Sequence, residues 1–80
     1  MTLAELGNVL RGLREMRRLT QAEAAGLATM TASRVGAIEN GGDPRVSELW
    51  KLLDVYRVDK EATALLLSRW VVFEPAVTTT

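Results

Sequence analysis

The chain has 80 residues, of which 48% are apolar and 25% charged, and its 10 basic and 10 acidic side chains give a formal net charge of zero. A chain of this length forms one small domain, which buries only about 60–65% of the surface that its unfolded form exposes. Because the sequence contains neither Cys nor His, disulfides, thiolate zinc sites and imidazole catalysis are excluded. We therefore expect a protein that is not an enzyme and needs neither a metal nor a cofactor.

The sequence gives no sign of export or of a membrane span. Met1 to Glu5 lacks the basic and apolar regions of a signal peptide, and no apolar run approaches the roughly 18 residues that a span needs. We expect a cytoplasmic protein without a membrane partner. A net charge of zero argues against unspecific binding of polyanions, but basic residues crowd the N-terminal segment, at Arg11, Arg14, Arg17 and Arg18.

Apolar spacing and capping residues predict three helices in the first half of the chain. The first runs from about Thr2 to Arg17, because leucines recur there at spacings of three and four. The second begins after Thr20, whose spacing to Glu23 is that of a capping box, and ends near Ala28. A third helix, capped by Thr31, spans residues 32–39 and ends at a run of turn-forming residues.

Two more helices are predicted after Pro44. The fourth ends near Val55, with an apolar set of Val46, Leu49, Trp50, Leu53 and Tyr56. The fifth is capped by Asp59 and continues to about Val71, with an apolar set of Ala62, Leu65, Leu66 and Trp70. Helical spacing places four aromatic side chains in the core: Trp50, Tyr56, Trp70 and Phe73. We expect an all-α, five-helix domain over residues 1–72 and a C-terminal tail over residues 73–80.

The second and third helices are each too short to persist alone, so they must pack on the rest of the domain. Two short capped helices joined by a tight turn form a helix-turn-helix. From Thr20 onward the chain reads Thr-Gln-x-Glu-x-Ala-x-x-x-x-x-Thr-x-Ser-x-Val-x-x-Ile-Glu-Asn-Gly. This pattern resembles the phage-repressor (Cro-like, XRE) helix-turn-helix family, over roughly residues 3–70, and looks most like actinobacterial members.

The resemblance implies a repressor-like bundle that binds double-stranded DNA. Actinobacterial members often carry a further C-terminal domain, so a further domain or a protein partner at the last helix is also consistent with it. One departure concerns Thr29, which occupies the turn position that the family usually fills with Gly. A positive φ angle is less favourable for Thr than for Gly at that position.

The third helix presents the candidate base contacts if Val35 and Ile38 face inward. These contacts are Thr31, Ala32, Ser33, Arg34 and Ala37. Arg34 is the strongest candidate, because a guanidinium can pair bidentately with guanine; the alternative is a phosphate contact or a solvated charge. The two alanines can make only apolar contacts, such as with a thymine methyl group. Gly36 either permits a close approach or is merely tolerated, at a cost of about 1 kcal/mol.

Phosphate contacts are expected from Thr20, Gln21, Asn40, Gly41 and Arg45. The alternatives are that Gln21 is a solvated residue of the first helical turn and that the Asn-Gly pair only ends a helix. Within the resemblance, Arg14 and Glu39 match a structural ion pair between the first and third helices. We therefore assign these two residues to the fold and not to DNA binding.

The fifth helix is apolar on more than one face. One small domain cannot bury all of these side chains, so we expect a homodimer interface at Leu66, Trp70, Val71 and Phe73. The alternative is that a further domain covers them.

The sequence leaves two functions open. The first is a sequence-specific, repressor-type transcriptional regulator that binds DNA as a homodimer, with residues 31–39 in the major groove. The alternative is a protein-interaction module on the same fold, such as an antitoxin or an adaptor, which the zero net charge and the small side chains of the third helix favour. A steep salt dependence of DNA binding would separate them.

Overall fold

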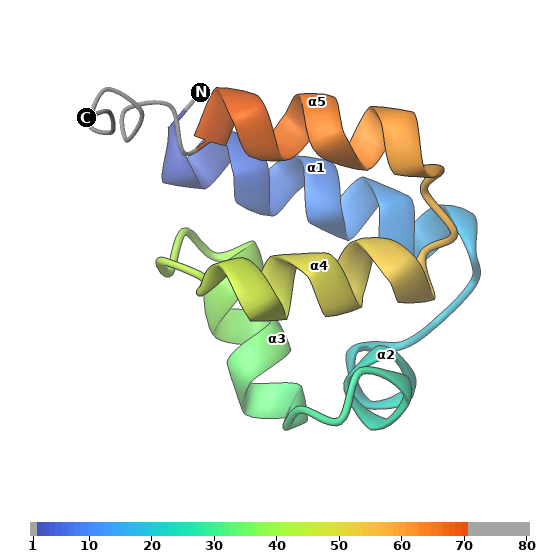
Figure 1. Cartoon of the computed structure of the whole chain (residues 1–80). Coiled ribbons are helices and arrows are strands. Elements are labelled where there is room, and N and C mark those ends of the chain that lie inside the picture. Colours follow the sequence, from blue (N-terminus) through green and yellow to red (C-terminus); the bar gives the residue numbers. More distant parts are fainter. Residues whose placement is uncertain (1, 71–80) are drawn as a thin grey trace.

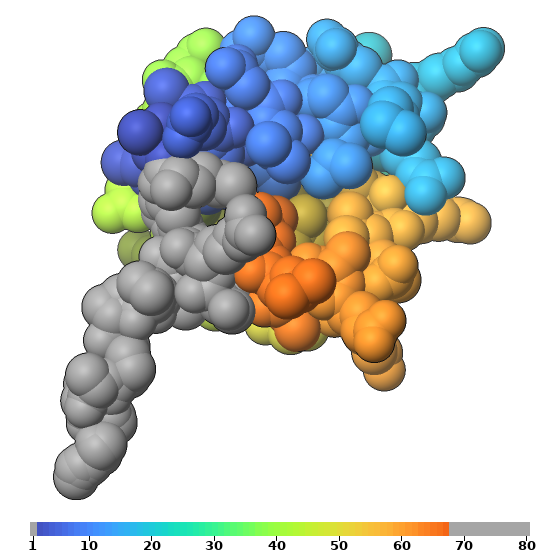
Figure 2. Space-filling view, turned by 90° about the horizontal axis from the view of Figure 1, so that it is seen from above, coloured from blue at the N-terminus to red at the C-terminus, as the bar shows by residue number. Residues whose placement is uncertain are grey.

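The computed structural model describes residues 2–70 of the chain, with side chains as far as residue 67. The helices in this part follow one another in the order α1 (Leu3–Met16), α2 (Gln21–Leu27), α3 (Ala32–Glu39), α4 (Val46–Val55) and α5 (Lys60–Trp70). Figure 1 shows α1, α4 and α5 running roughly along one direction, with the α2–α3 pair below them. In the view from above, α1 and α5 lie side by side on the face turned away from that pair (Figure 2). The predicted all-α, five-helix domain is confirmed.

Local side-chain caps fix the helix starts. The hydroxyl groups of Thr2, Thr20 and Thr31 accept hydrogen bonds from the backbone N–H groups three residues later, at distances of 3.0–3.1 Å. Asp59 caps α5 in the same way, through a bond of 2.8 Å from the N–H of Ala62 to its Oδ1. Each cap satisfies an N–H that has no partner inside its helix. The four predicted capping residues are confirmed.

The first four helices end in the same backbone motif. In each, the N–H of the second residue after the cap bonds back to a carbonyl of the last turn, as from Gly42 to Ala37 at 2.8 Å. This is the Schellman arrangement, and it requires a positive φ angle at the residue just after the cap. Glycine fills that place only at Gly41, whereas the other three helices use Arg18, Thr29 and Arg57. The chain therefore turns sharply at these three positions without the residue that does so most easily.

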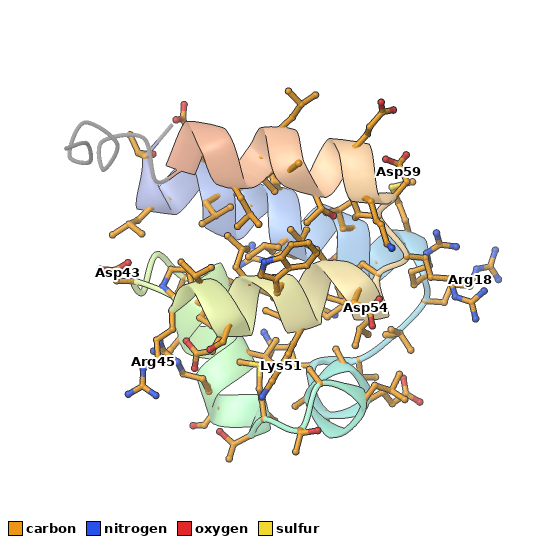
Figure 3. The ribbon with its side chains drawn as sticks, in the orientation of Figure 1. Arg18, Asp43, Arg45, Lys51, Asp54 and Asp59 are labelled. Atoms are coloured by element: carbon orange, nitrogen blue, oxygen red, sulfur yellow. The ribbon has the colours of Figure 1, made fainter. Side chains whose placement is uncertain are left out.

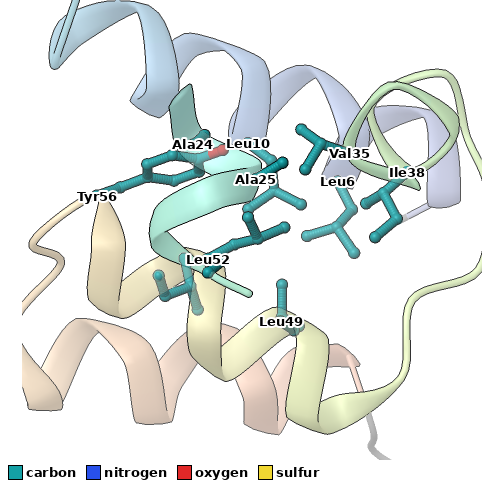
Figure 4. Close-up of a cluster of buried hydrophobic side chains, with 11 residues drawn as sticks. Leu6, Leu10, Ala24, Ala25, Val35, Ile38, Leu49, Leu52 and Tyr56 are labelled. Carbon is teal, nitrogen blue, oxygen red and sulfur yellow. The ribbon is translucent and has the colours of Figure 1, made fainter. Parts of the chain in front are cut away.

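The core lies where α1, α2, α3 and α4 meet (Figure 4). Its fully buried side chains are Leu6, Leu10, Ala24, Ala25, Ala28, Val35, Ile38, Leu49, Leu52, Leu53 and Tyr56. Apolar residues at the second position after the helix caps, among them Leu19, Met30 and Val58, pack against this cluster. The helix ends are thus held by the core as well as by their backbone bonds.

The prediction of which residues of α4 and α5 face the core was wrong in part. Trp50 is 46% exposed, because α4 turns Leu49, Leu52, Leu53 and Tyr56 toward the core and Trp50 lies beside that stripe. Val46 is exposed as well. In α5 the packed positions are Thr63, Leu66 and Leu67, whereas Ala62 and Leu65 face outward. Of the four aromatic residues expected in the core, Tyr56 is confirmed.

Other predictions concern residues that the structure does not describe. The side chain of Trp70, the expected helix end at Val71, the position of Phe73 and the boundary of a tail at residues 73–80 lie outside the described part of the chain. Among the described helices, none is both long enough and apolar enough to cross a membrane.

Candidate nucleic-acid interface

Helices α2 and α3 form a helix-turn-helix. They pack mainly against each other, and the turn between them closes through a bond of 2.8 Å from the N–H of Met30 to the carbonyl of Ala25. Thr29 takes φ +57° in this turn, so the chain adopts there the conformation that we expected to be unfavourable for Thr. Met30 packs against the core and anchors the turn. In this helix-turn-helix, one side of α3 packs against the domain and the opposite side lies at the surface.

The outward face of α3 consists of small side chains. Val35, Ile38 and Glu39 are buried, whereas Ala32, Ser33 and Ala37 are exposed. Because successive residues turn by about 100° around a helix, residues 32, 33, 36 and 37 share an arc of about 140°. We call these four residues the reading face. Thr31 lies exposed at its N-terminal end.

Arg34 lies outside the reading face, on the side of α3 that faces α4. Its Nε and Nη2 atoms donate to the two carboxylate oxygens of Glu48, at 2.9 and 2.8 Å. The Nη2 atom also donates to the backbone carbonyl of Asp43 at 2.9 Å. The hydrogen bond from Arg34 is the main cause that lowers the pKa of Glu48 to about 2. In this structure the guanidinium of Arg34 is therefore committed to an ion pair within the protein.

Gln21 points toward α3. Its Nε2 donates to Oε1 of Glu39 at 3.1 Å, and its side chain covers Gly36. A Cβ at Gly36 would lie 3.4 Å from Oε1 of Gln21, which is an ordinary van der Waals contact, so the packing of Gln21 does not require a glycine at this position.

Glu39 is the centre of the polar contacts behind α3. Its buried carboxylate pairs with Arg14 at 2.7 and 3.0 Å, and Nε of Arg11 lies 3.6 Å from it. Burial raises the pKa of the Glu39 carboxyl, but the hydrogen bonds from Arg14 and Gln21 and the positive charges of Arg14 and Arg11 outweigh it, so the pKa is lowered. The carboxylate therefore stays ionised and fixes α1, α2 and α3 relative to one another.

Asn40 and Gly41, two of the expected phosphate contacts, have structural partners. Oδ1 of Asn40 accepts a bond of 3.2 Å from Nη2 of Arg11. Gly41 takes φ +101°, and its N–H donates to the carbonyl of Ile38 at 3.1 Å. These contacts are those of a pair that ends a helix, which was the alternative interpretation of the Asn-Gly sequence.

Arg45 and Thr20 are exposed at the starts of α4 and α2. Figure 3 shows the side chain of Arg45 extending into solvent beside α3. The backbone N–H of Arg45 donates to Oε1 of Glu48 at 2.8 Å, which gives Glu48 a second role at the start of α4. The sequence analysis missed Glu48, although its position three residues after the cap residue Arg45 is that of a capping acid.

The residues expected at a dimer interface are described only in part. Leu66 is half-buried and packs against the core, while its neighbour Leu65 is 66% exposed. The side chain of Trp70, and all of Val71 and Phe73, lie outside the described part of the chain.

Comparison with known proteins identifies the fold. The family model described as helix-turn-helix domain matches residues 5–66, which include all but the first two residues of α1, the whole of α2, α3 and α4, and α5 as far as Leu66. No curated protein and no solved structure gives a significant match. The matched segment covers more than half of the chain and contains the α2–α3 pair that the capping residues and the turn hold in place. The chain therefore belongs to the helix-turn-helix domain family of XRE/Cro-like type, whose domain implies binding to DNA.

Proposed function

We propose that this protein is a sequence-specific transcriptional regulator that places α3 in the major groove of double-stranded DNA. The observation that carries the proposal is the position of α3. Val35, Ile38 and Glu39 hold it to the domain by one face, while Ala32, Ser33 and Ala37 are exposed on the opposite side. A second helix presented in this way is the element that enters the major groove in helix-turn-helix proteins.

The proposed contacts follow from the geometry. Base edges are contacted from Thr31, Ala32, Ser33 and Ala37, because these residues are exposed at or beside the reading face. Arg34 takes part only if it leaves Glu48, so we assign it first to the α3–α4 packing. Phosphate contacts come from the surrounding residues Thr20, Gln21, Asn40, Gly41 and Arg45. Among these, Arg45 combines exposure with a positive charge.

We further propose that the regulator acts as a homodimer that reads two half-sites about one helical turn apart. The apolar residues of α5 and beyond, namely Leu65, Leu66, Trp70, Val71 and Phe73, supply the interface. The exposure of Leu65 supports this assignment, because a leucine exposed beside further apolar residues is typical of association sites.

The test is selection from a library of randomised duplexes with the purified chain, followed by a salt titration of the selected site. We expect enrichment of a palindromic site and a steep loss of affinity with salt. Arg45→Ala should reduce the salt slope by about one unit. Arg57→Ala is the matched control, because Arg57 is also exposed but lies at the other end of α4, and the slope should not change. Failure to enrich any site at low salt would contradict the proposal.

The second candidate function is binding of a protein partner. A shallow hollow of about 380 Å³ is lined by Leu19, Ala22, Glu23, Gly26 and Leu27. Leu27 is 64% exposed there, and together with Leu19 and Ala22 it gives the hollow an apolar lining that favours contact with another apolar surface. Replacement of Leu27 by the uncharged polar residue Gln would weaken such a contact and leave DNA affinity unchanged, so the two functions are separable by one variant.

A further inference from the structure

Three of the long polar side chains around α3 are bound within the protein, whereas Arg45 extends into solvent (Figure 3). Gln21 donates to Glu39, and Arg34 donates to Glu48 and to the carbonyl of Asp43. Arg11 donates to Asn40. Bidentate recognition of guanine or adenine needs a guanidinium or an amide that points at the base edge. Each of these three candidates already has a hydrogen-bond partner within the protein.

The groups that remain exposed on the reading face are small. Ala32 and Ala37 present methyl groups, and Ser33 presents one hydroxyl. In the major groove, the only apolar group that distinguishes the four base pairs is the C5-methyl group of thymine. Side chains as short as these also allow the helix to lie deep in the groove, where methyl groups come into contact.

We propose that α3 recognises its DNA site mainly through contacts of Ala32 and Ala37 with thymine methyl groups, while Glu48 holds Arg34 away from the base edges. The proposal rests on the DNA-binding function proposed above and specifies its ligand: a duplex with thymines at the positions that face α3. In this scheme Glu48 is a positioning residue, because it acts through Arg34 and touches no base.

Uracil is the sharpest probe, because it differs from thymine only by the missing methyl group. The selected duplex is remade with deoxyuridine at one thymine at a time, and its affinity for the unaltered protein is measured. Replacing a thymine that contacts an alanine should reduce the affinity of the protein for the duplex about three- to fourfold, the value expected for the loss of one buried methyl group. Replacing a thymine at any other position should leave this affinity unchanged.

A pair of variants tests the protein side of the same contact. Ala37→Gly removes the methyl group, and its affinity should no longer depend on uracil at the position that Ala37 faces. Ala64→Gly is the control, because Ala64 is also an exposed alanine inside a helix, but in α5. Ala64→Gly loses the same helix propensity as Ala37→Gly, and the DNA affinity of this control should still fall when uracil replaces the thymine.

The role of Glu48 is tested by Glu48→Gln, which removes the charge that holds Arg34. Selection with this variant should enrich guanine at one position of each half-site, because the released guanidinium can pair with it. Glu61→Gln, at an exposed carboxylate of α5, should select the original site. An unchanged site for Glu48→Gln would overturn the positioning role.

The outcomes separate this inference from the proposed function. If the protein binds no duplex, the DNA-binding function itself is contradicted. If it selects a site but binds the uracil and thymine forms equally well, methyl recognition is overturned and the regulator function stands. Loss of affinity confined to a few thymines, and its disappearance in Ala37→Gly, would establish the inference.

Discussion

Arg14 of α1 and Glu39 of α3 meet in a two-point ion pair, with Nε to Oε2 at 2.7 Å and Nη2 to Oε1 at 3.0 Å. The remaining nitrogen of the guanidinium, Nη1, donates to the backbone carbonyl of Leu19 at 2.9 Å. One side chain therefore ties together α1, the turn that follows it and the inner side of α3. The exposed face of α3 depends on this pair for its orientation.

Breaking the pair from one side should destabilise the fold strongly. Arg14→Met or Glu39→Met leaves a buried polar partner without its counterpart, and each should cost about 3–5 kcal/mol of unfolding free energy. The double replacement Arg14→Met with Glu39→Met should cost less than the sum of the single changes, because no uncompensated charge remains. Urea denaturation of the single and double variants measures the coupling, and strictly additive losses would contradict it.

Gly7 should tolerate no side chain. A Cβ at Gly7 would lie 2.8 Å from the carbonyl oxygen of Ile38 and closer still to that of Glu39, so Gly7→Ala forces α1 away from α3 at a cost of about 3 kcal/mol. Gly12→Ala is the matched control in the same helix, since a Cβ there meets nothing within 4 Å. It should stabilise the protein by up to about 1 kcal/mol through helix propensity. Thermal unfolding of both variants tests the contrast, and equal effects would rule out the close packing as its cause.

Thr29→Gly should stabilise the protein. Thr29 takes φ +57° in the turn between α2 and α3, a conformation that costs roughly 1–2 kcal/mol for a residue with a Cβ and little for glycine. Because glycine also loses more chain entropy on folding, we expect a net gain of about 1 kcal/mol in urea denaturation. Thr29→Ala keeps the Cβ and is the control. If Ala stabilised as much as Gly, the backbone angle would not be the reason.

Tyr56 provides a prediction about a buried hydroxyl. Its phenol oxygen has no hydrogen-bond partner within the described structure. Tyr56→Phe should therefore stabilise the protein by about 1 kcal/mol, because the variant removes a buried polar group without leaving a large cavity. Tyr56→Ala, which removes the ring, should instead cost about 3–5 kcal/mol. A loss of stability in the Phe variant would indicate that the hydroxyl has a partner in solution.

The same residue predicts a loss of stability at high pH. Burial, and next to it the negative charge of Glu39, raise the pKa of Tyr56 to about 12 from an ordinary value of 10.0. Between these two values the unfolded chain releases the proton and the folded chain keeps it, so the unfolding free energy falls as the pH rises. Below pH 10 this contribution is fully present. Tyr56 is the single tyrosine of the chain, so tyrosinate absorbance reports its titration directly, and Tyr56→Phe should lack this part of the alkaline loss.

The sequence by itself determined the helices and the helix-turn-helix. The hydroxyls of Thr2, Thr20 and Thr31 cap N–H groups only three residues away, so the helix starts follow from local chemistry. The predicted α3, residues 32–39, matches the observed helix, Ala32–Glu39, because a cap precedes it and an Asn-Gly pair follows it. Such signals do not depend on how the helices pack.

Only the tertiary structure decided which side chains face inward and which polar groups pair. Trp50 and Tyr56 both fit an apolar stripe in the sequence, yet the angle at which α4 meets the core buries the second and exposes the first. Arg34 has its carboxylate partner 14 residues away, in Glu48, and Gln21 has its own 18 residues away, in Glu39. Whether two helices bring such groups within hydrogen-bond distance depends on the packing of the whole core. This is the physical reason why α3 and its exposed small side chains could be located from the sequence, while the ion pair that holds Arg34 could not.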